Sequence, residues 1–179
     1  MENAPNLVLV GPMGAGKTSI GKRLADRFGL AFADSDREVE AQTGVAVTTV
    51  FECEGEPGFR ARERSALATL LAGAGRVVAT GGGAVLDAGT RDAMRARGFV
   101  VYLRVGLDEQ LARLARDRAR PLLAGDDRET VLRRLATARE PLYAEVADLR
   151  FDTDGLAPME ACARLGHLLD DRWRRGAAA

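Results

Sequence analysis

The stretch Gly11-Pro12-Met13-Gly14-Ala15-Gly16-Lys17-Thr18 matches the pattern G-x-x-x-x-G-K-[S/T]. It follows the apolar run NLVLV at residues 6–10, which is typical of a buried strand. It precedes residues 19–28, in which apolar side chains recur at helical spacing until Gly29 ends the pattern. A strand before the glycines and a helix after them are the context that this motif requires. The segment therefore predicts a phosphate-binding loop.

A glycine-rich backbone of this kind can turn its N–H groups inward around phosphate oxygens, and the following helix adds its positive N-terminal end. Lys17 is placed to reach the β- and γ-phosphates, and the Thr18 hydroxyl to ligate Mg²⁺. We therefore expect a bound nucleoside triphosphate, held by Gly14, Ala15, Gly16, Lys17, Thr18 and Ser19. The motif by itself leaves open a kinase, a GTPase, an ATP-driven machine or a nucleotide sensor. A plain glycine turn is the structural alternative.

Short apolar runs alternate with helix-prone segments along the rest of the chain. Strands are expected at residues 6–10, 30–33, 76–80, 99–103 and 149–152. Helices are expected at residues 19–28, 87–97, 107–115, 128–146 and 158–173, with two or three more between 38 and 71, where Thr43-Gly44 and Gly55-Glu56-Pro57-Gly58 interrupt the pattern. This alternation predicts an α/β fold: a three-layer α/β/α sandwich around a five-stranded parallel sheet.

The chain has 179 residues and no linker or repeat, so a single domain spanning residues 1–179 is expected. The charged stretch at residues 116–127, RDRARPLLAGDD, lies between helices and is interpreted either as a mobile lid or as an ordinary solvated loop. Residues 174–179 are expected to fray.

Composition excludes several classes of protein. Lys+Arg and Asp+Glu are both 26, which argues against a general nucleic-acid or anionic-membrane binder. No apolar run approaches the roughly 18 residues that cross a bilayer, and no secretory signal is recognisable, so a cytoplasmic protein is expected. Cys53, Cys162 and His167 are too few and too widely spaced for a zinc cage, and the cysteines are interpreted as reduced. Nothing in the sequence requires more than a monomer.

Charged and glycine residues follow two of the expected strands. Asp34 and Asp36 come at the end of the second strand, where one carboxylate could hold a Mg²⁺-bound water and the other accept a proton; capping of a helix is the alternative. Gly81-Gly82-Gly83 ends the third strand and could admit a ligand to the backbone, or simply form a turn. Arg60 and Arg139 could each bind a carboxylate bidentately, or be solvated surface residues.

Taken together, these pieces resemble the shikimate kinase family over roughly residues 6–172. The matching segments are GPMGAGKTSIGKRLA, DSD at 34–36, GEPGFRARE at 55–63, TGGGAV at 80–85, RPLLAG at 120–125, RE-PLY at 139–143 and FDTDGLAP at 151–158. The resemblance implies a P-loop kinase with substrate-binding helices at about residues 36–64 and a lid at 116–127. It also implies ATP- and Mg²⁺-dependent phosphorylation of the 3-hydroxyl of shikimate, a step toward chorismate and the aromatic amino acids.

The resemblance also implies roles for the residues on the acceptor side. Asp36 would hold the substrate hydroxyls and act as base, and Asp34 would contact a Mg²⁺-bound water. Arg60 and Arg139 would clamp the substrate carboxylate, with Gly81, Gly82 and Gly83 lining the substrate. Glu63 follows Arg60 by three residues on the same helical face, and could fix the Arg60 guanidinium in place.

On the nucleotide side, the resemblance implies that Arg120 closes over the phosphates and that Arg113 and Pro158 flank the adenine. The chain departs from the family at Leu156, where relatives often carry an arginine. Two other functions are weighed: a kinase of gluconate or of a nucleoside monophosphate, and a nucleotide-sensing module without catalysis. A GTPase is disfavoured because no Asn-Lys-x-Asp motif is present.

Overall fold

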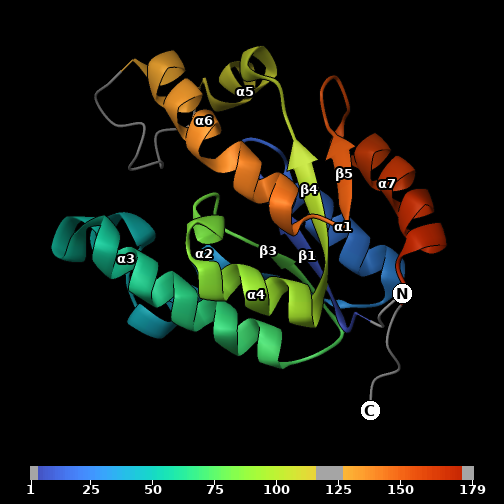
Figure 1. Ribbon diagram of the computed structural model, residues 1–179, viewed down its shortest axis with the longest axis horizontal. Coiled ribbons are helices and arrows are strands. Elements are labelled where there is room, and N and C mark those ends of the chain that lie inside the picture. The colour runs from blue at the N-terminus through green and yellow to red at the C-terminus, as the bar shows by residue number, and fades with distance from the viewer. Residues whose placement is uncertain (1–3, 116–126, 175–179) are drawn as a thin grey trace.

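Five parallel strands form one sheet in the part of the chain that the structure, a computed structural model, describes: residues 4–115 and 127–174. In spatial order they are β2 (Ala31–Asp34), β3 (Arg76–Ala79), β1 (Asn6–Val10), β4 (Gly98–Arg104) and β5 (Leu149–Asp152) (Figure 1). The central strand is β1, paired with β3 on one side and with β4 on the other. The expected five-stranded parallel sheet is confirmed.

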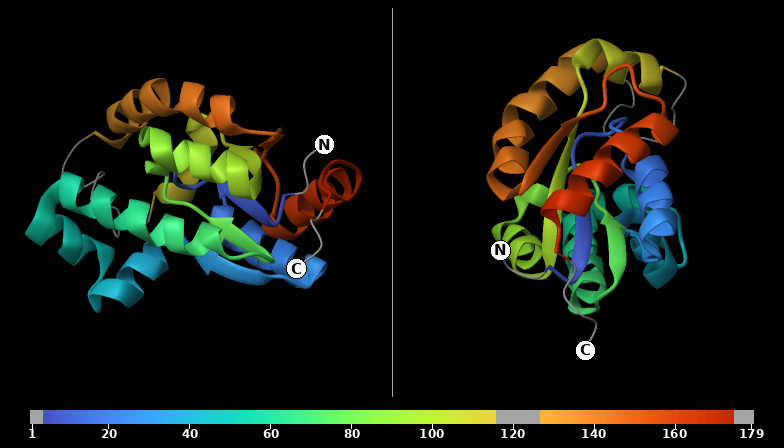
Figure 2. Two further views of the ribbon diagram at one scale, coloured as in Figure 1. Left: turned by 60° about the horizontal axis from the view of Figure 1, so that its bottom comes forward. Right: turned by 90° about the vertical axis from the view of Figure 1, so that its right-hand side faces the viewer.

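Helices lie between successive strands, and one more follows the last strand. They are α1 (Lys17–Phe28), α2 (Ser35–Thr43), α3 (Val47–Ala72), α4 (Ala88–Arg97), α5 (Leu107–Leu114), α6 (Arg128–Val146) and α7 (Pro158–Arg172), with a short 3₁₀ turn η1 at Ala84–Leu86. Helices α1 and α7 cover one face of the sheet, and α3, α4 and α6 cover the other (Figures 1 and 2). This arrangement is the predicted three-layer sandwich.

The two hydrophobic cores follow from the alternation of side chains along β1. Leu7 and Leu9 are fully buried against α1 and α7. Val8 and Val10 point the other way and are fully buried against α3, α4 and α6. A strand covered on both faces must be apolar at every position, which explains the unbroken run of valine and leucine after Asn6.

Several element boundaries differ by one or two residues from the sequence prediction, and two of these differences concern residues of the predicted site. Helix α1 begins at Lys17 rather than at residue 19, because the left-handed Gly16 (φ 91°) ends the loop and its carbonyl accepts from the Ile20 N–H at 2.8 Å. Strand β2 runs from Ala31 to Asp34 rather than over 30–33, in register with Arg76–Ala79 of β3. In both cases the shift moves a polar site residue from a loop into a regular element.

The break predicted at Gly55-Glu56-Pro57-Gly58 is a kink inside one long helix, α3. Gly55 has φ 66° and ψ −176°, and Pro57 lies in the first turn after the kink. Proline is tolerated there because the first N–H groups of a helical segment have no intrahelical acceptor. Helix α2 ends as predicted at Thr43, before the left-handed Gly44. After the kink, α3 carries Arg60 and Glu63 at the cavity and then packs Leu67, Leu70 and Leu71 against the sheet.

The remaining expectations concern single residues and the ends of the chain. His167 is exposed on α7, as expected for a residue on a helix face. Cys53 and Cys162 are free thiols, the first exposed and the second buried. In the described ranges no helix is both long and apolar enough to span a membrane. Residues 116–126, which include the segment interpreted as a lid, and most of the tail lie outside the described residues.

Candidate active site

A cavity of about 800 Å³ opens where the parallel strands end. Nearly every residue predicted to bind a ligand lines it: Gly14, Ala15, Gly16, Lys17, Thr18, Ser19, Asp34, Asp36, Arg60, Gly81, Gly82, Gly83, Arg113, Arg139 and Pro158. Arg120 is the exception, because it lies outside the described residues. The carboxyl edge of an open parallel sheet is where ligands bind in such folds.

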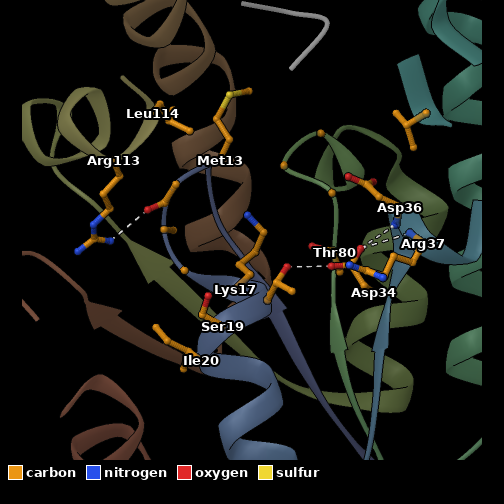
Figure 3. Close-up of a pocket in the computed structure, with 18 of the residues that line it drawn as sticks. Met13, Lys17, Ser19, Ile20, Asp34, Asp36, Arg37, Thr80, Arg113 and Leu114 are labelled. Carbon is orange, nitrogen blue, oxygen red and sulfur yellow. Dashed lines mark hydrogen bonds between the residues drawn. The ribbon is translucent and has the colours of Figure 1, made fainter. Parts of the chain in front are cut away.

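The phosphate-binding loop forms the middle of this cavity (Figure 3). Gly11 has φ 145°, and a Cβ there would collide with the Leu103 carbonyl oxygen, so the turn after β1 requires glycine. The Lys17 ammonium donates to the carbonyls of Gly11 and Pro12, at 2.7 and 2.8 Å. The lysine side chain therefore lies over the loop in which phosphate is expected.

Thr18 and Asp34 lie side by side, although 16 residues separate them in the sequence. The Thr18 hydroxyl donates to Asp34 Oδ2 at 2.9 Å. Asp34 Oδ1 accepts from the backbone N–H of Asp36 at 3.0 Å, so Asp34 also caps α2. The capping alternative is thus confirmed for Asp34, and the same residue faces the cavity. A hydroxyl beside a carboxylate is a set of hard oxygen donors suited to Mg²⁺.

Charged side chains converge at one end of the cavity, where the sequence predicts that the acceptor binds; they are Arg60, Glu63 and Arg139. Glu63 is 2 % exposed and accepts from the Arg60 guanidinium at 2.7 Å, as their spacing on one helical face predicted. Arg139, on α6, is 5 % exposed, so the alternative of a solvated surface arginine is wrong there. Burial raises the pKa of Glu63, and the charge and hydrogen bond of Arg60 oppose that rise. Glu63 and Arg60 therefore form an ion pair in which the carboxylate is buried.

The three glycines after β3 make this convergence possible. A Cβ at Gly81 would collide with Glu63 Oε1, and a Cβ at Gly83 would collide with the Arg60 guanidinium. At Gly82 it would lie 3.5 Å from Arg139 Nη1. Three charged groups from two helices thus lie against this backbone, and at Gly81 and Gly83 a side chain would displace them. The segment at residues 81–83 forms a turn, which was the structural alternative to a ligand-binding role, and it also lines the cavity.

Arg113 borders the opposite end of the cavity, beyond the phosphate loop (Figure 3), and Pro158 lines the same cavity. The Arg113 guanidinium donates to the carbonyl oxygens of Gly14, at 3.1 Å, and Thr153, at 2.7 Å. Glu109 accepts from its Nε at 2.8 Å. These contacts fix Arg113 against the loop. The half-buried Leu156 lines the same end.

Apolar residues that no sequence motif indicated line the end of the cavity near Arg60. Phe51 and Phe59 border the cavity, with ring centroids 4.6 Å apart. They lie on opposite sides of the Gly55 kink, which brings their rings together. Met13, inside the phosphate motif, is a lining residue as well. The helix breaker at residues 55–58, between Phe51 and Phe59, is the sequence signal that could have indicated this apolar wall of the cavity.

A nucleotide-phosphate loop that shares one cavity with a carboxylate and two arginines defines a P-loop kinase of small molecules. The comparisons with known proteins identify the family. The chain belongs to the shikimate kinase family, whose family model matches residues 13–170. It is accordingly an ATP-dependent kinase of aromatic amino acid biosynthesis, which confirms the resemblance drawn from the motifs.

Individual relatives match over nearly the whole chain. The shikimate kinase of Stenotrophomonas maltophilia (strain K279a) is 55% identical over 175 residues, which are 98% of this chain and 97% of the relative. That of Xanthomonas campestris pv. campestris (strain 8004) is 56% identical over 174 residues, or 97% of each chain. The solved structure of shikimate kinase from Acinetobacter baumannii in complex with shikimate superposes with a TM-score of 0.91, at 44% identity over 95% of both chains.

Proposed function

We propose that this protein transfers the γ-phosphoryl group of ATP to the 3-hydroxyl of shikimate, giving shikimate 3-phosphate and ADP. The observation that carries the proposal is the shared cavity, in which Lys17 and Thr18 face Asp36, Arg60 and Arg139. Phosphoryl transfer needs positioning and charge neutralisation more than covalent chemistry, and this cavity offers both.

The arginine pair binds the acceptor through its carboxylate. A guanidinium presents two parallel N–H donors to a carboxylate, and burial strengthens such a contact. Arg139 is buried, and Arg60 is held by Glu63 and Glu56, at 2.7 and 3.0 Å. Both arginines therefore lose little conformational freedom when the acid binds.

Asp36 holds the attacking hydroxyl and accepts its proton. It follows the Asp34 cap in the first turn of α2 and lines the same cavity as Lys17. A carboxylate within hydrogen-bonding reach of the nucleophile is the general base that kinases use.

Lys17 and Arg120 neutralise charge on the transferring phosphoryl group. Mg²⁺, held by the Thr18 hydroxyl and through water by Asp34, supplies further positive charge when bound with the nucleotide. Arg113 and Pro158 flank the adenine, because the acceptor occupies the opposite end of the cavity.

The lid at residues 116–127 excludes water during phosphoryl transfer. The enzyme acts as a cytoplasmic monomer and has no nucleic-acid or membrane partner.

The deciding experiment measures ADP release with ATP and Mg²⁺, with and without shikimate. We expect release that depends on shikimate and that gluconate does not support. Asp36→Asn should reduce kcat by at least two orders of magnitude while ATP still binds, because the hydroxyl loses its base. ATP binding without acceptor-dependent turnover would instead favour a nucleotide sensor, and full activity of Asp36→Asn would remove Asp36 from the mechanism.

A further inference from the structure

The glycine loop at residues 81–83 has no side chains with which to hold itself in place. Yet three charged groups lie against it: Glu63 at Gly81, Arg139 at Gly82 and Arg60 at Gly83. A small movement of this backbone would change the space available to both arginines. Other parts of the chain must therefore hold the loop in position.

Tyr143 contacts the loop from α6. Its side chain is 1 % exposed, and its hydroxyl donates to the Gly82 carbonyl oxygen at 2.5 Å. The ring stacks on Tyr102 of β4, with centroids 5.1 Å apart. Burial raises the pKa of Tyr143 well above its ordinary value, so the phenol stays protonated and remains a donor.

Arg139 lies close to the same hydroxyl. Tyr143 follows Arg139 by four residues, one helical turn along α6. The positive charge of Arg139 lowers the pKa of Tyr143 and so opposes the rise that burial causes. Arg139 Nη1 also lies 3.5 Å from the position that a Cβ of Gly82 would occupy. Arg139, Tyr143 and Gly82 therefore lie together, so a shift of the loop would disturb the orientation of the guanidinium.

Ser35 holds the loop from the other side. It is fully buried between Asp34 and Asp36, and its Oγ accepts from the Gly81 backbone N–H at 2.9 Å. Consecutive residues of the loop are therefore held by hydroxyls from two elements, α2 and α6. One hydroxyl satisfies an N–H and the other a C=O of this irregular segment.

We propose that Tyr143 and Ser35 are positioning residues for acceptor binding, which hold the 81–83 loop and, through Tyr143, orient Arg139. The proposal rests on the proposed function, because its readout is the affinity for shikimate. Loss of either hydroxyl would leave a loop group without its partner and loosen the acceptor end of the cavity. The hydrogen bonds of the two hydroxyls go to Gly81 and Gly82, so the phosphate loop should bind ATP as before.

The test compares Tyr143→Phe with Tyr102→Phe. Each change removes one hydroxyl from the same stacked pair of rings, but only Tyr143 donates to Gly82. We expect Tyr143→Phe to raise the KM for shikimate about tenfold, with kcat changed by less than about threefold and the KM for ATP unchanged. Tyr102→Phe should leave all three within about twofold.

A double-mutant cycle with Arg139→Lys tests whether Tyr143 acts through Arg139. If Tyr143 acts through Arg139, Tyr143→Phe should raise the KM for shikimate less in the Arg139→Lys background than alone. Strictly additive effects would overturn the part of the proposal that concerns Arg139.

The remaining outcomes are also decisive. An unchanged KM for shikimate, or equal changes in both KM values with a lower melting temperature, would make Tyr143 a merely structural residue. Should Tyr143→Phe fail to fold, Ser35→Ala carries the same expectation of a selective rise in the KM for shikimate. If the unaltered protein releases no ADP with shikimate, the proposed function fails and this inference fails with it. If the unaltered protein is active and both variants keep its KM for shikimate, only this inference is overturned.

Discussion

Lys17 is one of two lysines in the chain, and both lie on α1. Its ammonium contacts the carbonyls of the phosphate loop, whereas Lys22 is exposed beside the Phe32 ring. Lys17→Met should lower kcat by about 10²–10³, since it removes a charge that stabilises the transferring phosphoryl group. Lys22→Met is the matched control, and the coupled ADP-release assay measures both. Equal activity of the two variants would contradict the role of Lys17.

Arg139 gives a second prediction at the scale of one residue. Arg139→Ala should raise the KM for shikimate about tenfold or more and leave the KM for ATP unchanged. The reason is that the substrate carboxylate loses a buried guanidinium with which it would pair. Arg134 lies on the same helix and is exposed, so Arg134→Ala provides the control in the same steady-state assay. An unaltered KM for shikimate would remove Arg139 from the acceptor site.

Helix α4 illustrates how a single side chain stabilises an element. The Asp87 carboxylate accepts from the Thr90 N–H at 2.8 Å and the Thr90 hydroxyl at 2.9 Å, which makes Asp87 the N-cap. Asp87→Ala should lower the free energy of unfolding by about 1 kcal/mol at pH 7, as urea denaturation would measure. Asp92→Ala, in the exposed middle of the same helix, should have less effect.

The same cap predicts a dependence on pH. The hydrogen bond from the Thr90 backbone is the main cause that lowers the pKa of Asp87. A depressed pKa means that the stabilisation is complete above the unfolded-state pKa of about 4 and is lost as the pH falls below it. The difference in stability between the unaltered protein and Asp87→Ala should therefore shrink below pH 4. A difference that is constant down to pH 2 would contradict a charged cap.

At the scale of the whole molecule, Trp173 joins the two ends of the fold. It is 6 % exposed, its indole N–H donates to the Ala4 carbonyl at 3.1 Å, and its ring meets Phe28 of α1 edge-on at 5.6 Å. Ala4 precedes β1, so Trp173 lies at the amino edge of the sheet, opposite the active-site cavity.

Trp173→Ala should therefore reduce stability without changing catalysis. We expect the free energy of unfolding to fall by about 3 kcal/mol, because a large buried ring is removed, while kcat at 25 °C stays the same. Circular dichroism in urea measures the change, with the exposed Met159→Ala on α7 as control. A loss of kcat in the folded variant would indicate that the amino edge influences the cavity.

Local sequence determined the phosphate loop, the five strands and the pairing of Arg60 with Glu63. These depend on contacts between near neighbours: glycines that permit a turn, apolar runs that suit a buried strand, and an i,i+3 spacing on one helix. Two of the misplaced boundaries, at Lys17 and Asp34, fall on residues whose polar side chains suit a loop equally well. There the backbone hydrogen bonds of the helix and the register with β3 decided the boundary.

Tertiary structure alone decided which of the many arginines are buried and what lies around them. The sequence of α6 does not reveal that Arg139 is buried while Arg134 is exposed, because burial depends on the elements packed against the helix. Nor does it reveal that Tyr143 reaches Gly82, 61 residues away, or that Thr18 touches Asp34. Such contacts form between strands and helices that are distant in the sequence, so local sequence patterns do not indicate them.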